Sequence, residues 1–529
     1  MSMNNQGRPT KSDSVLVDAP VTFTGNKALQ ISEALIFETG DFAGTGVDFP
    51  EPAGISSRLG GLERNDTIGL PGLSEPEAMR HYVRLSQKNY AIDMGPFPLG
   101  SCTMKHNPRL NEKMARLPGF GDVHPLQPES TVQGALELID SLSHWLKTLI
   151  GMPAVAMSPK AGAHGELCGM MAIKKAIEAR GEAEIRTRVL APESAHGTNP
   201  ATAAQCGFRV DSIPADDTGR VDLEAFRAKL GPDVAGIMVT NPNTCGLFER
   251  DIRAIADAVH EVGGYFYCDG ANFNAIAGKA RPGDLGIDAM HINLHKTFST
   301  PHGGGGPGSG PTVFSQALAP FAPVPFIVHD GTRFKLVETR KAANSEADGE
   351  GGKSFGRMTA FHGQMGMFVR ALSYMLSHGV DGVRKAAEDA VLNANYVQAR
   401  LREEMTTAFD GICMHEALFD DRFLKDTGVE TIDFAKAMID EGYHPMTMYF
   451  PLVVHGAMLI EPTESESKRE LDQFCDALLS LARKAKSGEM ADQFKAAPVY
   501  APMRRLDETA AARKPVLRWT PPEQKQAAE

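Results

Sequence analysis

Long apolar stretches are missing from this chain. No run of about 18 apolar residues occurs anywhere in it, so the sequence offers no transmembrane helix. The opening residues, MSMNNQGRPTKSDS, contain no apolar core followed by a small-residue cleavage site, and a secretory signal is therefore not expected. We expect a cytoplasmic protein that has no membrane partner.

Paired cysteines and an excess of positive charge are absent as well. The 7 cysteines show no CxxC or CxxxC spacing, which is typical of free thiols in a reducing compartment and predicts neither a disulfide framework nor a metal site. The formal net charge of −12 argues against nucleic acid as a main partner. No GxGxxG or GxxxxGK[ST] motif follows an expected strand, which weakens a nucleotide-binding interpretation.

The composition that remains is that of a soluble globular protein. The chain has 529 residues, of which 42% are hydrophobic and 23% are charged. This length indicates more than one domain. No internal repeat with a period of about 20 to 50 residues is visible, so a solenoid is not expected.

Expected strands and helices alternate through the middle of the chain. A long helix is predicted over 130–150, because apolar residues recur there at three- and four-residue spacing. Short, fully apolar strands that alternate with helices predict an α/β domain with a mostly parallel sheet. The further helices are expected over 165–180, 223–230 and 252–262, and the strands over 188–191, 208–213, 234–240, 265–268 and 289–294.

The regions before and after this domain show a different pattern of expected helices and strands. Residues 1–95 are expected to form an N-terminal arm and extended segment, with a helix over 74–84 that starts at a Ser cap. Residues 96–332 would form the large α/β domain, which begins with an irregular loop. A smaller α+β domain is predicted over 333–519, with a helix over 365–401 and strands over 446–451 and 457–460, and a disordered tail over 520–529.

One lysine stands out as a candidate for chemistry. His295 and Lys296 follow the expected strand 289–294, and a four-glycine run, Gly303 to Gly306, comes soon after. Glycines allow the backbone to approach a ligand closely. A desolvated lysine loses its proton readily and then attacks carbonyl groups. The alternative is a solvated lysine beside a flexible linker.

Three other segments lie at strand ends or helix starts, where ligands bind in open parallel sheets. Gly162 and Ala163 precede a helix expected to begin near Gly165, and free N–H groups there can cradle a phosphate. His196 follows a strand and could stack on an aromatic ligand, bond a phosphate or cap local backbone. Asp269 directly follows the strand 265–268, a costly place for a charge unless it is paired. A pyridinium N–H, an arginine or a helix N-terminus could be its partner.

Together these segments match the needs of pyridoxal phosphate. The cofactor requires a lysine that holds it as an imine, and Lys296 fits this role. It also requires an acid that keeps the ring nitrogen protonated, so that the ring withdraws electrons from the substrate, and Asp269 fits here. A phosphate cradle at Gly162 and Ala163 and the flat face of His196 would complete the site.

With these residues in view, the chain resembles a known family, the P-protein of the glycine cleavage system, or glycine dehydrogenase (decarboxylating). It is most similar to subunit 2 of the two-subunit bacterial form. The resemblance extends from about Leu73 to Trp519, whereas GDFAGTGVDFPEPAG departs from the family's usual start. The matching stretches include PLGSCTMKHNP, AGAHGE, SAHGTNPA, NPNTCGLFE, YCDGANFNAI, HINLHKTFSTPHGGGGPGSGP and MTMYFPLVVHGAMLIEPTESESK.

The resemblance implies a fold-type I, transferase-like pyridoxal-phosphate enzyme with a large α/β domain and a small C-terminal domain. Carried over by position, Lys296 would form the imine and Asp269 would face the pyridinium nitrogen. His196 would stack on the ring, and Gly162 and Ala163 would lie near the phosphate. His295 would either contact the phosphate or have a structural role.

The family's reaction is an oxidoreductase step that decarboxylates glycine. It releases CO₂ and transfers the aminomethyl group to the lipoyl arm of the H-protein. The resemblance also implies a separate subunit 1, in a heterotetramer of two copies of each subunit. Two alternatives stay open: another fold-type I enzyme, such as an amino-acid decarboxylase or a cysteine desulfurase, and a non-catalytic scaffold subunit.

Several polar residues have no assigned role from the sequence. His106, His124 and Arg357 are candidates for the glycine carboxylate by residue type only, and surface roles are favoured for each. Cys102 could take part in redox chemistry with the lipoyl disulfide, but a small side chain filling an ordered loop is the favoured interpretation.

Overall fold

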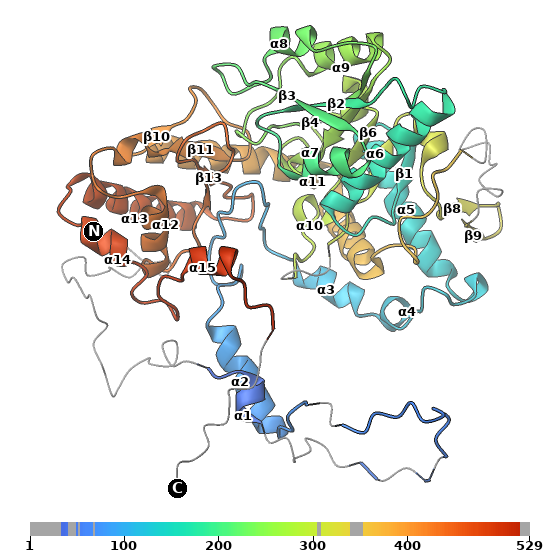
Figure 1. Ribbon diagram of the computed structural model, residues 1–529, viewed down its shortest axis with the longest axis horizontal. Helices are drawn as coiled ribbons and strands as arrows, with labels where there is room; N and C mark the ends of the chain where they lie inside the picture. The colour runs from blue at the N-terminus through green and yellow to red at the C-terminus, as the bar shows by residue number, and fades with distance from the viewer. Residues whose placement is uncertain are drawn as a thin grey trace. The chain divides into compact units, whose positions relative to one another are not determined.

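Figure 1 shows the computed structural model, which describes residues 33–40, 49–50, 53–54, 56–66, 69–303, 308–338 and 353–518. Residues 92–491 belong to one compact unit, and the described parts of 13–91 and 492–518 belong to a second. Every residue of the candidate site lies in the first unit. The predictions for Gly304 to Gly306 and for the tail 520–529 fall outside the described residues.

A seven-stranded sheet is the centre of the first unit, with the strand order β1-β7-β6-β5-β4-β2-β3. Strands β2 to β6 pair in parallel, while β7 is antiparallel to both β6 and β1. The mostly parallel sheet predicted from the sequence is therefore confirmed. The strands are β1 (Ala154–Ala156), β2 (Arg188–Pro192), β3 (Arg209–Ile213), β4 (Val234–Thr240), β5 (Tyr265–Asp269), β6 (Ala289–His291) and β7 (Thr312–Phe314).

Helices cover both faces of this sheet, because its central strands are apolar on both sides (Figure 1). Along β5, Phe266 and Cys268 pack in one apolar layer with α5 and α9, whereas Tyr265 and Tyr267 pack in the opposite layer with α6. Such two-sided burial is the reason that these strands read as continuous apolar runs. The covering helices are α5 (Gln133–Ile150), α6 (Gly162–Ala179), α7 (Thr198–Gln205), α8 (Leu223–Ala228) and α9 (Ile252–Glu261).

A second, four-stranded sheet follows in the chain, with the antiparallel order β10-β11-β13-β12. The long helix α11 (Met365–Leu401) leads to it with the predicted bounds, but its backbone leaves helical geometry at Gly379. Helices α12 (Thr431–Asp440) and α13 (Lys468–Lys486) complete this region. The strands are β10 (Thr406–Thr407), β11 (Ala417–Asp420), β12 (Thr447–Met448) and β13 (Met458–Ile460). A domain boundary near residue 332 stays a prediction.

The loop 94–108 contains no helix or strand, as expected, yet its contacts hold it in place. Leu99 forms an isolated antiparallel bridge with Ile460 of β13, so the loop runs beside the four-stranded sheet. Further along it, the buried Lys105 pairs with Glu464 at 2.5 Å and donates a hydrogen bond to Asn274 at 3.0 Å. The loop is thereby attached to both parts of the first unit.

Smaller elements complete the described chain. The Ser-capped helix expected over 74–84 is present as α2 (Glu75–Gln87) in the second unit. None of the helices in the described ranges is long and apolar enough to cross a membrane. The other α-helices and strands are α1 (Ile36–Thr39), α3 (Arg109–Ala115), α4 (Pro118–Gly121), α10 (Leu294–Thr297), α14 (Ala491–Ala496), α15 (Glu508–Arg513), and the hairpin of β8 (Phe326–His329) and β9 (Phe334–Val337).

Candidate active site

Lys296 lies in a one-turn helix and not directly after a strand. The strand predicted over 289–294 is wrong in its second half, because β6 ends at His291 and α10 begins at Leu294. The backbone leaves the parallel ladder at this point, since Leu294 N–H donates to the carbonyl of Ser309 at 3.1 Å. The turn aims the amine of Lys296 at the loop 94–108, where Nζ donates to the carbonyl of Ser101 at 2.7 Å.

Asp269 is the last residue of β5, which runs one residue beyond the predicted strand 265–268, and it is 2% exposed. Its carboxylate accepts hydrogen bonds from the Asn199 side-chain amide and from the Ala271 N–H, both at 2.9 Å. Burial works to raise the pKa of Asp269, but His291, these two donors and Lys296 together hold it below its usual value. Asp269 is therefore an anion inside an apolar sheet, ready to face a cationic N–H group.

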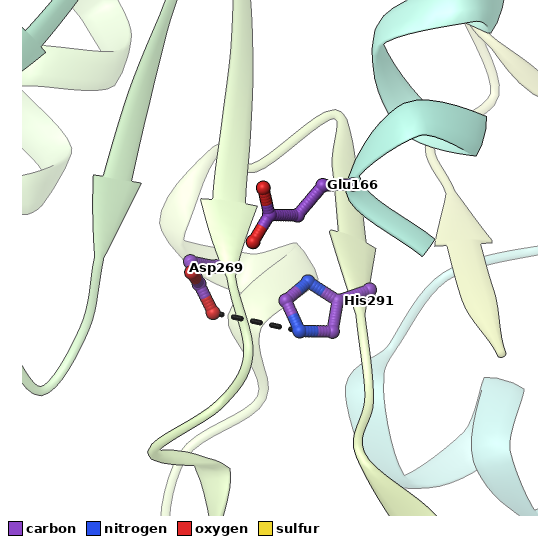
Figure 2. A group of neighbouring side chains, drawn as sticks. All are labelled: Glu166, Asp269 and His291. Carbon is purple, nitrogen blue, oxygen red and sulfur yellow. Dashed lines mark ion pairs between the residues drawn. The ribbon is translucent and has the colours of Figure 1, made fainter. Parts of the chain in front are cut away.

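Two further buried side chains stand beside Asp269, and the sequence reasoning missed both (Figure 2). Glu166 comes from the first turns of α6, and His291 is the last residue of β6. His291 Nε2 lies 3.5 Å from Asp269 Oδ1, while its Nδ1 is 2.6 Å from the hydroxyl of Tyr267. One atom from each of Glu166, Asp269 and His291 falls within 4.8 Å of the others. A metal ion could fit this spacing, but each of the three already has a protein hydrogen-bond partner.

The carboxyl group of Glu166 is expected to carry a proton near neutral pH. It accepts hydrogen bonds from the hydroxyls of Thr198 at 2.8 Å and Thr202 at 3.1 Å. Burial, and then the negative charge of Asp269, raise its pKa from 4.5 to about 8. Two adjacent carboxyls with opposite pKa shifts can hold a fixed charge pattern, with Asp269 anionic and Glu166 neutral.

This protonation predicts a specific dependence of stability on pH. The pKa of Glu166 is higher in the folded protein than the unfolded value of 4.5, so its contribution is fully present below about pH 4.5 and is lost as the pH rises through about 8. Glu166→Gln removes the titrating proton. We expect the melting temperature of the cofactor-free variant to fall less between pH 5.5 and pH 8.5 than that of the unmodified protein, by about 2 °C or more. Differential scanning fluorimetry measures both curves.

Glu178 provides the matched control, because it lies on the same helix but forms a surface ion pair with Lys175. Glu178→Gln should keep the pH slope of the unmodified protein. A Glu166→Gln slope that equals the control slope would contradict a protonated Glu166.

His196 lies in the turn between β2 and α7, as its position in the sequence suggested. Its Nδ1 is 2.8 Å from the Thr198 hydroxyl, and its ring is 5.6 Å from the ring of Phe450 in an edge-to-face arrangement. Burial lowers its pKa, and the charges of Asp269 and Lys296 act on it in opposite directions. An uncharged ring that lies near both of these residues suits stacking, while its bond to Thr198 also matches the capping alternative.

The expected phosphate cradle is the start of α6, and the predicted helix start near Gly165 was three residues late. The helix begins at Gly162, because the small side chains allow close packing there. A Cβ atom added to Gly162 would lie 2.7 Å from Asn293 Oδ1. Ala163 is exposed one residue further on. No side chain among the described residues caps the start of this 18-residue helix, so its first N–H groups can donate to an anion.

His295 contacts two residues that lie close by, Ser309 and His302. Its Nδ1 accepts a hydrogen bond from the Ser309 N–H at 3.3 Å, and its ring packs edge-to-face against His302 at 5.1 Å. Burial, followed by the charges of neighbouring groups, lowers its pKa to about 3. His295 can therefore offer a phosphate only a neutral N–H.

The polar groups around these residues fit pyridoxal phosphate. Several buried hydroxyls in the segments beside Lys296 and α6 have no hydrogen-bond partner among the described residues, namely those of Ser158, Thr297, Thr300 and Ser309. A buried hydroxyl without a partner is costly, and phosphate oxygens accept hydrogen bonds from such groups. The hydroxyl donors thus match the phosphate of the cofactor, and the buried anion Asp269 matches its ring nitrogen. The amine of Lys296 matches the position at which the imine forms.

The roles of the remaining candidates stay undecided. His106, His124 and Arg357 are exposed, as favoured from the sequence, and Arg357 pairs with Glu338 at 2.9 Å. The Sγ atom of Cys102 is 3.4 Å from His302 Nε2. Burial raises the pKa of the Cys102 thiol, which favours the unreactive thiol form.

The chain is similar to known proteins over almost its whole length. Residues 386–500 match the family "Glycine dehydrogenase, C-terminal domain", and residues 170–305 match "Aminotransferase class-V". The chain is 66% identical over 523 residues to the "Probable glycine dehydrogenase (decarboxylating) subunit 2" of Caulobacter vibrioides, with 98% of each chain covered. It is 50% identical to the protein of the same name from Caldanaerobacter subterraneus, over 86% of this chain and 91% of the relative.

A solved structure supports the fold. The crystal structure of the glycine decarboxylase (P-protein) of the glycine cleavage system, in inhibitor-bound form, matches with a TM-score of 0.64 at 20% identity, over 83% of this chain and 92% of that one. The fold is that of the fold-type I pyridoxal-phosphate enzymes, as expected from the sequence. The chain belongs to the glycine dehydrogenase (decarboxylating) subunit 2 family.

Proposed function

We propose, from this family membership, that the chain decarboxylates glycine with pyridoxal phosphate as cofactor and passes the aminomethyl group to the lipoyl arm of the H-protein. The observation that carries the proposal is the match over 98% of both chains, which includes the segments of Lys296 and Asp269. A scaffold subunit would have no need to keep an anion as deeply buried as Asp269 near Lys296, since burying a charge costs free energy.

The chain's own residues divide the work on the cofactor. Lys296 would be the point of covalent attachment, and Asp269 would hold the ring nitrogen and keep it protonated. His196 would stack on the ring, while Gly162 and Ala163, with His295, would hold the phosphate at the helix start. The bound cofactor supplies an electron sink for the carbon that loses CO₂.

The partners follow from the same membership. The relatives are named subunit 2, which implies a subunit 1. We propose a heterotetramer of two copies of each subunit in the cytoplasm, with the lipoylated H-protein as the second protein partner. Glycine is the small-molecule substrate.

The test is an exchange assay on the chain co-purified with subunit 1. Labelled bicarbonate should enter the carboxyl group of glycine, and this exchange should require the lipoylated H-protein. A free amine as product would identify an amino-acid decarboxylase, and sulfide release from cysteine would identify a cysteine desulfurase. Cofactor binding without any exchange would contradict the proposal.

A further inference from the structure

A second pair of buried carboxyl groups lies at one end of the four-stranded sheet. Glu416 directly precedes β11, and Glu461 directly follows β13. These strands are antiparallel neighbours, with Ala417 opposite Ile460, so the sheet places the two glutamates side by side. Glu416 is 0% exposed and Glu461 is 1% exposed.

The loop 94–108 connects this pair to Lys296. The Ser101 N–H donates to Glu416 Oε2 at 2.7 Å, and the Ser101 carbonyl accepts from Lys296 Nζ at 2.7 Å. The hydroxyl of Thr103, two residues further on, donates to Glu461 Oε1. Ser101 therefore connects the Lys296 amine to the Glu416 carboxyl. The loop 94–108 donates hydrogen bonds to both glutamates.

The other titratable groups that face the pair are neutral or already paired. Lys105 and Glu464 form an ion pair with each other. Burial lowers the pKa of His415 to about 3 and raises the pKa values of the Cys245 and Cys413 thiols to about 12. Burial likewise raises the pKa of the third thiol near the pair, Cys102.

Within the described residues, the cation that acts on both Glu416 and Glu461 is Lys296, which has no carboxylate partner of its own. Two full negative charges side by side in a dry site repel each other strongly, so one proton shared between them is the stable state. Burial and the neighbouring carboxyl raise the pKa of Glu416, and burial raises that of Glu461 to about 7.

Unsatisfied atoms at the same place support this arrangement. His415 is 0% exposed, and neither of its ring nitrogens has a hydrogen-bond partner among the described residues. Its Nε2 lies 3.8 Å from Glu461 Oε1, and Glu461 Oε2 also has no partner there. Glu416 accepts hydrogen bonds from the Ser101 N–H and from the Asn272 side-chain amide, whereas Glu461 accepts one, from Thr103. The oxygen of Glu461 without a donor disfavours a full negative charge on both groups.

We propose that Glu416 and Glu461 share one proton and together present a single negative charge to the nitrogen of Lys296, which favours a proton on that nitrogen once the cofactor is attached to it. This inference rests on the proposed function, because it concerns the nitrogen to which the cofactor is attached. Both glutamates are positioning residues that act through Ser101 and through their charge.

The test uses Glu416→Gln, Glu461→Gln and the double variant, all in the full-length chain. If one proton is shared, either single variant leaves one ionised carboxylate, because the amide replaces the protonated acid. The first measurement is the infrared C=O absorption of protonated carboxyl groups at pH 7 in the cofactor-free chain. Each single variant should lose the same band. Persistence of this band in both would overturn the proposal.

The second measurement is a pH titration of the absorbance of the bound cofactor, which reports the proton on the Lys296 nitrogen. The midpoint should move by less than about 0.3 units in each single variant and fall by about 1 unit or more in the double variant. A single variant that shifts the midpoint as far as the double variant would overturn the shared proton. So would a divalent ion that purifies with the chain in equal amount and is lost in Glu461→Gln.

Glu249→Gln is the matched control for both measurements. Glu249 is another buried glutamate whose pKa burial raises to about 7, but it bonds to Asn243 and Val221 and not to the loop 94–108. It should lose an infrared band without moving the cofactor midpoint. The infrared result does not depend on the cofactor, so its failure is distinct from a failure of the proposed function, which would show as no cofactor absorbance in the unmodified chain.

Discussion

Lys296→Ala is expected to abolish the visible absorbance of the bound cofactor and to lower glycine exchange by about 1000-fold or more. The variant loses the amine that donates to the Ser101 carbonyl, and with it the covalent attachment point. Lys296 is partly buried, and its removal leaves a single carbonyl without a donor, so the fold should survive. Absorbance after addition of pyridoxal phosphate and the bicarbonate exchange rate measure the two effects.

Lys279→Ala is the matched lysine control, because Lys279 forms a half-exposed ion pair with Glu388 on the same unit. It should change exchange by less than about twofold, since surface ion pairs contribute little. Exchange in Lys296→Ala at more than a tenth of the unmodified rate would contradict the role given to this lysine.

Asp269→Asn is expected to lower the exchange rate by about 100-fold or more while the cofactor still attaches to Lys296. The substitution keeps the size of the side chain but removes the negative charge that holds the ring nitrogen protonated. It also places an amide opposite the donor group of Asn199. Single-turnover rates and the absorbance spectrum separate slow chemistry from poor cofactor binding.

The same substitution has a second consequence inside the protein. The charge of Asp269 is one of the causes that raise the pKa of Glu166, so this pKa should fall in Asp269→Asn.

Asp288→Asn is the control for the exchange measurement, because Asp288 is a buried aspartate that bonds to His260 and the Phe266 N–H away from Lys296. It should lower the melting temperature without slowing exchange. An unchanged exchange rate in Asp269→Asn would contradict its assignment.

The sequence predicted best where one local rule decides the structure. The bounds of β4 and α11 match the prediction because apolar runs and helical periodicity are strong over those segments. Asp269 was predicted as a site residue because a carboxylate after an apolar strand is rare without a purpose. Glu461 follows β13 in the same way, and this signal could have identified it too.

The site residues and helix or strand ends that were not predicted depend mostly on contacts between segments far apart in the sequence. Glu166 and His291 are ordinary residues in the sequence, and only the packing of α6 on the sheet brings them to Asp269. The end of β6 at His291 depends on hydrogen bonds to residues 309 and 311, which no local pattern reveals. The start of α6 at Gly162 was missed because glycine is a poor helix former, although it packs well at a helix end.

The loop 94–108 gives Lys296 a mechanical link to the four-stranded sheet. Leu99 is bridged to β13, and two residues later the Ser101 carbonyl holds the lysine amine. A rotation of that sheet would therefore move the Ser101 carbonyl, which accepts the hydrogen bond from the Lys296 amine. Such a movement would reach the nitrogen through Leu99 and Ser101.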